Sequence, residues 1–409
     1  MLETHQDKPA VATRLDLRLY IRQQPVMLAL LAVLAVISFA AVSGLSRAYH
    51  AQRAALGNRW FSRGVADLNA RHFDSAVTEF RAALLYAPDN YDYQLNLAEA
   101  LIGLKRTGEA YSYLVNLWDQ QPEHGQVNLE LARIAAQRGQ TGQALRYYHN
   151  AIYAVWPGDP EEKRRDTRLE LIEYLLSIHA QAEGQAELIA LEENLGDDPS
   201  QQQRVGDLFL RAQDYEHALG AYHISLKSDP HRERAMAGAG LAAFELGRYP
   251  LAEHRLQEAV AGNPDDTPSA DLLKTTEQVL QMDPFRRPLS VAHRDEIVVQ
   301  AFRTAGERLK SCGIRASAAP APGAQPTLAD RWAKLKPQVS EQYLRREPDL
   351  VEQAMDLVFS IERQTSTTQT STTQTGPSQT RPTPTGATCG TPTGEDLALL
   401  LIAKLHEGT

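Results

Sequence analysis

The residue types that most often do chemistry are present but scattered along the 409-residue chain. The two cysteines, Cys312 and Cys389, lie far apart and form no Cys-x-x-Cys pair, which argues against most zinc and thioredoxin-like sites. Either they are unrelated buried thiols, or they form a disulfide that joins two C-terminal pieces in an oxidising compartment. The twelve histidines are dispersed, and His217 and His223 are spaced poorly for two ligands on one helical face.

The familiar motifs of catalysis and cofactor binding do not occur. The sequence contains no Gly-rich phosphate loop, metalloprotease His pair, Ca²⁺ loop or serine-nucleophile elbow. We therefore predict no catalytic residue, metal or cofactor, no small-molecule substrate and no enzyme; an enzyme with an unfamiliar site in 290–409 is the less favoured alternative. The net charge of −9, without a long Lys/Arg run, argues against nucleic acid as a partner.

One segment near the N-terminus is apolar enough for a membrane. Residues 25–46 carry no charged side chain and have the length of a transmembrane helix. We expect a single-pass protein of the inner (cytoplasmic) membrane, with residues 1–24 as a cytoplasmic tail and the rest periplasmic or extracytoplasmic. The alternative is a cleaved signal peptide, with Ala41 and Ser43 flanking the cut, and a soluble periplasmic protein.

Small residues and prolines recur at one fixed period through the middle of the chain. The period links Ala76, Ala110 and Ala144; Pro88 and Pro122; Gly206 and Gly240; Ala218 and Ala252; Pro230 and Pro264. The period is about 34 residues, and a repeat of that length predicts stacked helix–turn–helix units. Small side chains let paired helices pack closely, and a proline near the end of each unit stops its second helix.

These units resemble tetratricopeptide repeats. The first unit, 57–90, carries the residues of that family's pattern: Trp60, Gly64, Ala76, Phe80, Ala83 and Pro88. Further units follow at 91–124, 125–158 (its Pro157 shifted by one), 199–232 and 233–266, with 159–198 as a divergent unit. The resemblance thus covers five to six repeats in 57–266. It implies an all-α, right-handed superhelical solenoid whose groove binds peptides or protein surfaces without catalysis.

Positions on the inner helices of the first three units mark the groove that the resemblance implies. The side chains expected to line it are Phe61, Val65, Leu68, Leu95, Asn96, Glu99, Leu129 and Arg133. Repeats that clamp the acidic tails of heat-shock chaperones carry Lys, Arg and Asn at inner-helix sites that correspond here to Phe61, Val65, Asn96, Gln126 and Glu130, and only Asn96 fits.

The C-terminal part is predicted to contain further helices. We expect a helical cap at 267–311, an Ala/Pro linker at 312–326, helices at 327–363 opened by a Thr327–Asp330 capping box, and a Thr-rich disordered linker at 364–394. An apolar helix at 395–407, capped by Thr393 with Asp396, ends the chain. This helix either docks on the protein's own helices or serves as a tethered motif for a partner.

The sequence therefore favours a membrane-anchored scaffold or adaptor that binds proteins or peptides through its repeats, in the assembly of a cell-envelope complex. A chaperone-like factor for envelope or secreted subunits is the alternative function. The partner's identity is not encoded in any motif.

Overall fold

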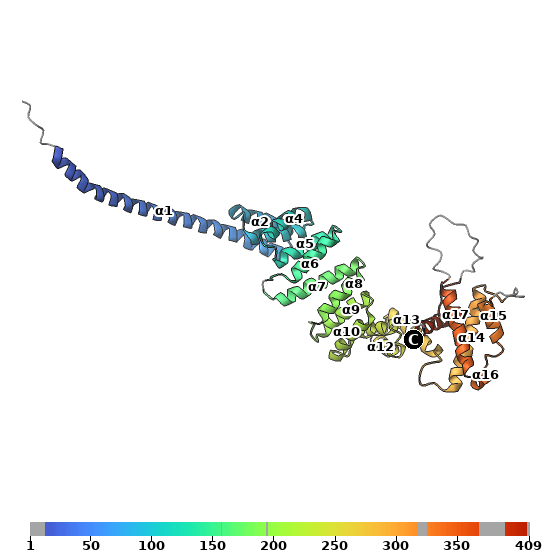
Figure 1. Cartoon of the computed structure of the whole chain (residues 1–409). Coiled ribbons are helices and arrows are strands. Elements are labelled where there is room, and N and C mark those ends of the chain that lie inside the picture. The colour runs from blue at the N-terminus through green and yellow to red at the C-terminus, as the bar shows by residue number, and fades with distance from the viewer. Residues whose placement is uncertain (1–12, 157, 194, 317–324, 368–388, 407–409) are drawn as a thin grey trace, which may run out of the picture. The chain divides into compact units, whose positions relative to one another are not determined.

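The computed structural model describes residues 13–156, 158–193, 195–316, 325–367 and 389–406, with side chains from Met27 onward. Within these ranges the prediction of an all-α fold is confirmed, since the structure contains eighteen helices and no strand (Figure 1). The chain divides into two compact units, residues 1–171 and 172–409. Their boundary falls inside helix α7 (Pro160–Ser177).

Helix α1 (Thr13–Asn69) is one unbroken helix that contains both the apolar segment and the first helix of the repeats (Figure 1). From Met27 to Leu45 its large apolar side chains are exposed, with no part of the protein over them. By length and composition this helix could cross a membrane, and its most apolar window has a mean hydropathy of 2.5. A signal sequence would pass the same test.

Antiparallel helix pairs build the rest of the first unit. The close approach within a pair needs small residues: an added Cβ on Gly64 of α1 would lie 2.6 Å from the ring of Phe80, which is fully buried. Ala76, Ala110 and Ala144, spaced by the period, are likewise buried. The last part of α1 pairs with α2 (Phe73–Tyr86), α3 (Tyr91–Gly103) with α4 (Thr107–Gln120), and α5 (Gly125–Gln137) with α6 (Thr141–Ile152).

The turn inside each helix pair holds one residue in the left-handed conformation. In the first unit these residues are Arg71, Lys105 and Gly139, which follow one another at the repeat period. In the second unit His179, Gln213 and Gly247 repeat the same spacing. The step from Gly139 to His179 is longer than the period. Helix α7 has 18 residues where α5 has 13, so α7 and α8 (Gln181–Glu192) are a repeat pair whose first helix carries a short insertion.

The second unit continues the repeats and then closes them. An aromatic ring joins two consecutive pairs: added Cβ atoms on Gly206 of α9 and on Gly238 of α11 would both collide with the buried ring of Tyr222. The helices are α9 (Pro199–Arg211), α10 (Tyr215–Ser228), α11 (Glu233–Glu245), α12 (Tyr249–Gly262), α13 (Thr267–Met282) and α14 (Val291–Ser311).

The last four helices share one apolar core with α13 and α14. They are α15 (Leu328–Leu335), α16 (Glu341–Arg346), α17 (Asp349–Thr367) and α18 (Glu395–Leu405). The predicted capping box of Thr327 with Asp330 is confirmed at the start of α15. Helix α18 packs against α13, α14 and α17 with Leu399 and Ile402 fully buried, so it is docked on the protein's own helices.

A disulfide joins Cys312, at the end of α14, to Cys389, which precedes α18. Beside it the buried Arg308 donates a 2.7 Å hydrogen bond to the carbonyl oxygen of Gly390 and pairs with Asp396 at 3.7 Å. The alternative of two unrelated thiols therefore does not hold in this structure.

Two details of the C-terminal prediction are wrong. Helix α17 continues to Thr367, beyond the predicted end at 363, because the last turn buries Thr365, whose hydroxyl donates 2.8 Å to the carbonyl oxygen of Ile361. Helix α18 is not capped by Thr393, since its N-cap is Gly394 without a side-chain bond. Pro157, residues 1–12 of the predicted tail, and the greater parts of the linkers predicted at 312–326 and 364–394 lie outside the described residues, as do residues 407–409.

Candidate functional site

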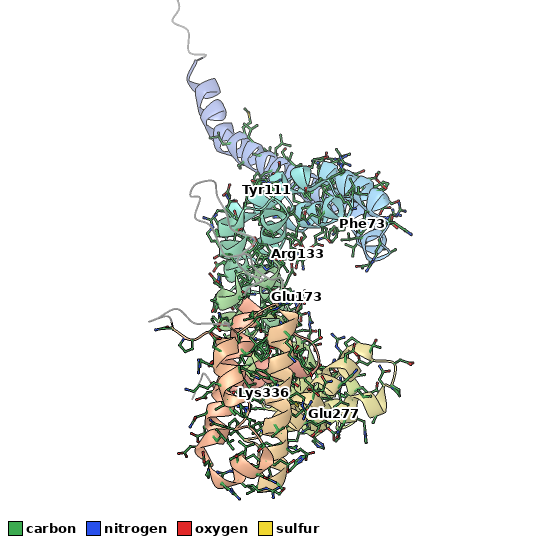
Figure 2. The ribbon with its side chains drawn as sticks, turned by 90° about the vertical axis from the view of Figure 1, so that its right-hand side faces the viewer. Phe73, Tyr111, Arg133, Glu173, Glu277 and Lys336 are labelled. Atoms are coloured by element: carbon green, nitrogen blue, oxygen red, sulfur yellow. A yellow bond between two sulfur atoms is a disulfide. The ribbon has the colours of Figure 1, made fainter. Side chains whose placement is uncertain are left out.

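The eight residues expected to line a groove lie on the first helices of the three pairs in the first unit. Helix α1 carries Phe61, Val65 and Leu68, helix α3 carries Leu95, Asn96 and Glu99, and helix α5 carries Leu129 and Arg133, which Figure 2 marks. We call the surface formed by these eight residues the A-helix face. Which of them a partner contacts stays a prediction.

The apolar members of this face differ in how much surface they offer. Leu95 and Leu129 are only 8% and 7% exposed, so they belong mainly to the core. Phe61, Val65 and Leu68 are half-buried, and the Phe61 ring stacks on Tyr93 with the ring centroids 4.8 Å apart. The apolar surface open to a partner is therefore concentrated on α1.

The polar members gather at the other end of the face. Arg133 binds Glu170 of α7 through two hydrogen bonds of 2.8 and 2.7 Å, and it donates a third of 2.7 Å to Glu130. Such two-pronged contacts hold a guanidinium in place. Glu130 is only 5% exposed, and it also accepts a hydrogen bond from Gln126 at 3.1 Å.

Three carboxylates thus face one guanidinium. Burial, and after it the charge of Glu130, raises the pKa of Glu99 to about 7, although Gln126 and Arg133 act in the opposite direction. Burial also raises the pKa of Glu130, although Arg133 counteracts this effect. The side chain of Asn96 donates 2.8 Å to the carbonyl oxygen of Asp92 on its own helix. The carboxylates of this cluster can attract a cation.

Sequence reasoning found one side of this cluster and missed the other. Glu99 and Arg133 follow from the repeat register, whereas Glu170 lies in the divergent unit, after the insertion. The position of Glu170 in the repeat could be assigned only from the left-handed turn at His179, which fixes the register of that unit. Arg133 is a structural pairing partner as much as a surface residue.

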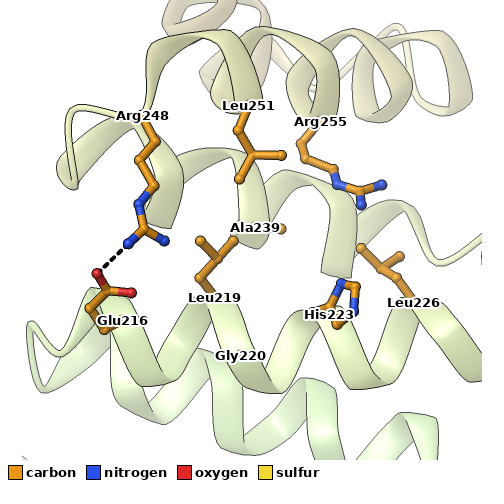
Figure 3. Close-up of a pocket in the computed structure, with 9 residues that line it drawn as sticks. All are labelled: Glu216, Leu219, Gly220, His223, Leu226, Ala239, Arg248, Leu251 and Arg255. Atoms are coloured by element: carbon orange, nitrogen blue, oxygen red, sulfur yellow. Dashed lines mark hydrogen bonds and ion pairs between the residues drawn. The ribbon is translucent and has the colours of Figure 1, made fainter.

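The second unit holds a depression of about 320 Å³ between α10, α11 and α12 (Figure 3). Its floor is apolar, from Leu219, Leu226 and Leu251. The charges at its rim are already paired, Arg248 with Glu216 at 2.6 Å, drawn in Figure 3, and Arg255 with Glu258 at 2.9 Å. The lining has no nucleophile with a base beside it.

Across the described parts of the chain, no group of three or more His, Cys, Asp or Glu residues could hold a metal ion.

Antiparallel helix pairs that recur at one fixed period, with small residues at each crossing, define a helical repeat protein. Residues 61–122 and 206–267 match the family model of the tetratricopeptide repeat. The matched segments cover the first and second pairs of the first unit and the pairs α9–α10 and α11–α12 of the second.

Several solved structures are similar to parts of this chain. YrrB, a TPR protein with an unusual peptide-binding site, is 14% identical over 47% of this chain and 96% of its own, with a TM-score of 0.38. PilW, a type IV pilus biogenesis factor, is 14% identical over 53% of this chain and 98% of its own, with a TM-score of 0.39. The C-terminal part of a TPR protein from Cytophaga hutchinsonii is 13% identical over 58% and 92%, with a TM-score of 0.44.

Proposed function

We propose that this protein is a membrane-anchored scaffold that binds a segment of another protein on its A-helix face, in the assembly of a complex at the cell envelope. Tetratricopeptide repeats carry this proposal, because such repeats are built to present a surface rather than a reaction centre. The apolar part of α1 supports the envelope location, in which residues 25–46 are the anchor and the repeats lie outside the cytoplasm.

The face favours a partner of particular chemistry. Half-buried Phe61, Val65 and Leu68 offer apolar contact on α1, and the carboxylates of Glu99 and Glu130 lie beyond them on α3 and α5. A segment that carries apolar side chains and a Lys or Arg residue would bury the former and pair the latter with Glu99. That pairing would offset the burial that now raises the pKa of Glu99 to about 7.

The test of this surface is the charge reversal E99K, with Arg133 left intact. A lysine at 99 lies beside Glu130, so the change should leave the fold in place while it repels a cationic partner. The matched control is D119K, an equal charge change on α4 at an exposed site near the helix C-terminus, where a cation is favourable.

The measurement is photo-crosslinking in intact cells from a reactive residue placed at Asn96, followed by mass spectrometry. We expect one stoichiometric product with the unaltered chain and with D119K, and its loss with E99K. An unchanged product in E99K would contradict the choice of surface. Many weak products from unrelated proteins, insensitive to E99K, would instead support a chaperone-like factor.

The anchor is tested separately. Resistance of the full chain to alkaline extraction of membranes, together with an intact mass that includes residues 1–46, is the expected result. A mature N-terminus near Ser43 would show that the segment is a cleaved signal peptide and would refute the anchor.

A further inference from the structure

Exposed large apolar side chains are rare on the repeats of the first unit. Among its described residues beyond Tyr49, they are Leu85, Tyr153 and Val155, which are 75%, 74% and 69% exposed. Apolar surface left uncovered in this way commonly marks an interaction site when the residues gather in one place.

These three residues lie at one edge of the helix stack. Leu85 is at the end of α2, and Tyr153 and Val155 follow α6, so all three stand where the second helix of a pair ends. Because the helices are antiparallel, the same edge holds the beginnings of α3 and α5 and the start of the repeat part of α1. We call the surface around Leu85, Tyr153 and Val155 the repeat edge.

A chain of contacts runs along this edge. The hydroxyl of Tyr93, in the first turn of α3, donates a 2.6 Å hydrogen bond to the side chain of Asn58 on α1. The rings of Tyr91 and His124, at the starts of α3 and α5, are 5.1 Å apart. The backbone at His124 then pairs with Val155, whose carbonyl oxygen accepts from Gly125 at 3.3 Å. The edge is therefore one continuous strip.

This strip lies on the side of the repeats that faces the apolar segment of α1, residues 25–46. The Arg53 guanidinium donates a 3.0 Å hydrogen bond to the carbonyl oxygen of Leu85, and Tyr49, Leu56, Leu85 and Tyr86 line one depression beside α1. Residues 49–53 follow Ser46 by three to seven positions, or about 5–10 Å of helix. The headgroup layer beyond the hydrocarbon is about 5–7 Å thick. A helix without a break leaves the edge no freedom to retreat from that layer.

The charges at this junction also suit a lipid surface. The chain has a net charge of −9, yet between Asp16 and Asp67 it contains no Asp or Glu. The same stretch carries Arg47, Arg53 and Arg59 directly after the apolar segment. Arginines pair with lipid phosphates, and tyrosines such as Tyr49, which is 57% exposed, favour the interface between headgroups and hydrocarbon.

We infer that the repeat edge rests on the membrane surface, with Leu85, Tyr153 and Val155 in the headgroup layer and Arg53 near the lipid phosphates. The inference rests on the anchor proposed above. The partner of this surface is an anionic bilayer, and its effect is to fix how the A-helix face is presented to other envelope proteins.

The test uses the full chain in nanodiscs of phosphatidylethanolamine and phosphatidylglycerol. Single cysteines are introduced as L85C, Y153C or V155C and labelled with a fluorophore under non-reducing conditions, where Cys312 and Cys389 are bonded to each other. The control is Q140C, at an exposed position in the turn between α5 and α6 on the opposite edge. Circular dichroism checks the helical fold of each variant.

Lipids that carry a doxyl quencher should reduce the fluorescence at the three edge positions and leave the control label bright. Unquenched edge labels in chains that remain inserted would overturn the inference while the anchor stands. Edge labels that doxyl lipids do not quench, yet that are protected from a water-soluble quencher, would place another protein or a second copy there and would also overturn it. Equal quenching of both edges would do the same. A chain that fails to insert in the nanodisc at all would refute the anchor, and the edge proposal with it.

Discussion

Tyr222 is held between glycines of two successive repeats, and this predicts opposite effects for two identical substitutions. In G206A the added methyl carbon would lie 2.8 Å from the ring of Tyr222. The ring is fully buried, and its hydroxyl donates a 2.6 Å hydrogen bond to Asp207. The ring cannot move away from Gly206, because the backbone of Gly238 lies close to its other side: a Cβ added at Gly238 would collide with the ring.

The control is G220A on the neighbouring helix α10, where the added carbon would meet nothing within 4 Å. Alanine in a helix interior is more favourable than glycine by about 1 kcal/mol, and this gain applies to both variants. Overpacking a tight site costs about 1–3 kcal/mol. The difference in local stability between G206A and G220A should therefore be about 1–3 kcal/mol, with G220A the more stable.

Hydrogen exchange with mass spectrometry is the suitable assay, because a repeat array opens in parts and a single melting curve would mix them. We expect faster exchange than in the unaltered chain for peptides of α9 to α11 in G206A, and slower exchange for α10 in G220A. Equal protection in the two variants would refute the reasoning, since it would show that the ring has room on one side.

Three further predictions concern buried charges and the disulfide. R133A leaves the carboxylate of Glu130 buried without its cation, which should cost about 3–5 kcal/mol in local stability, read by exchange in α5. Burial and the charge of Asp396 raise the pKa of Glu362 from 4.5 to about 8, although Arg308 acts in the opposite direction. Between these two values the folded state keeps a proton that the unfolded state releases, so the free energy of unfolding should fall as the pH rises from about 4.5 to about 8. Urea titrations at several pH values should show a smaller fall in E362Q. Replacing both cysteines by serine removes a 77-residue crosslink, worth about 4 kcal/mol, and should speed exchange in α18.

Each of these variants has a plain control or a contradicting result. R81A breaks an exposed pair with Glu109 and should cost only about 0.2–1 kcal/mol, so equal effects of R81A and R133A would contradict the buried-charge argument. E347Q, the same change at an exposed glutamate of the same unit, is the matched control for E362Q. An unchanged rate of hydrogen exchange in α18 after loss of the disulfide would show that packing alone holds this helix in place.

The sequence predicted the repeats because each repeat obeys local rules. Gly64 and Phe80, or Gly206 and Tyr222, belong to the two helices of a single pair, so the pattern that forms the contact is readable in a short window. The capping box at Thr327 was predictable for the same reason.

What the sequence did not predict depends on contacts between distant segments. The bonds from Arg133 to Glu170 join residues on either side of an insertion, and nothing local marks them. The bond between Cys312 and Cys389 became definite only when α18 was seen to be docked beside α14. The extension of α17 to Thr367 depends on a partner as well, since Arg308 donates 3.3 Å to the hydroxyl of Thr365 from another helix.

The absence of a joint in α1 has a geometric consequence for a chain held in a bilayer by that helix. Each residue inserted between Ser46 and Gly57 would turn the repeats by about 100° about the helix axis and lift them by about 1.5 Å. One inserted residue would thus rotate the A-helix face about the axis of α1 so that it faces another side, and about seven inserted residues would restore the original orientation roughly 10 Å farther from the membrane. The orientation in which this face meets a neighbouring protein then depends on the number of residues between Ser46 and Gly57. In that segment the number of residues is constrained even at positions where the residue type is not.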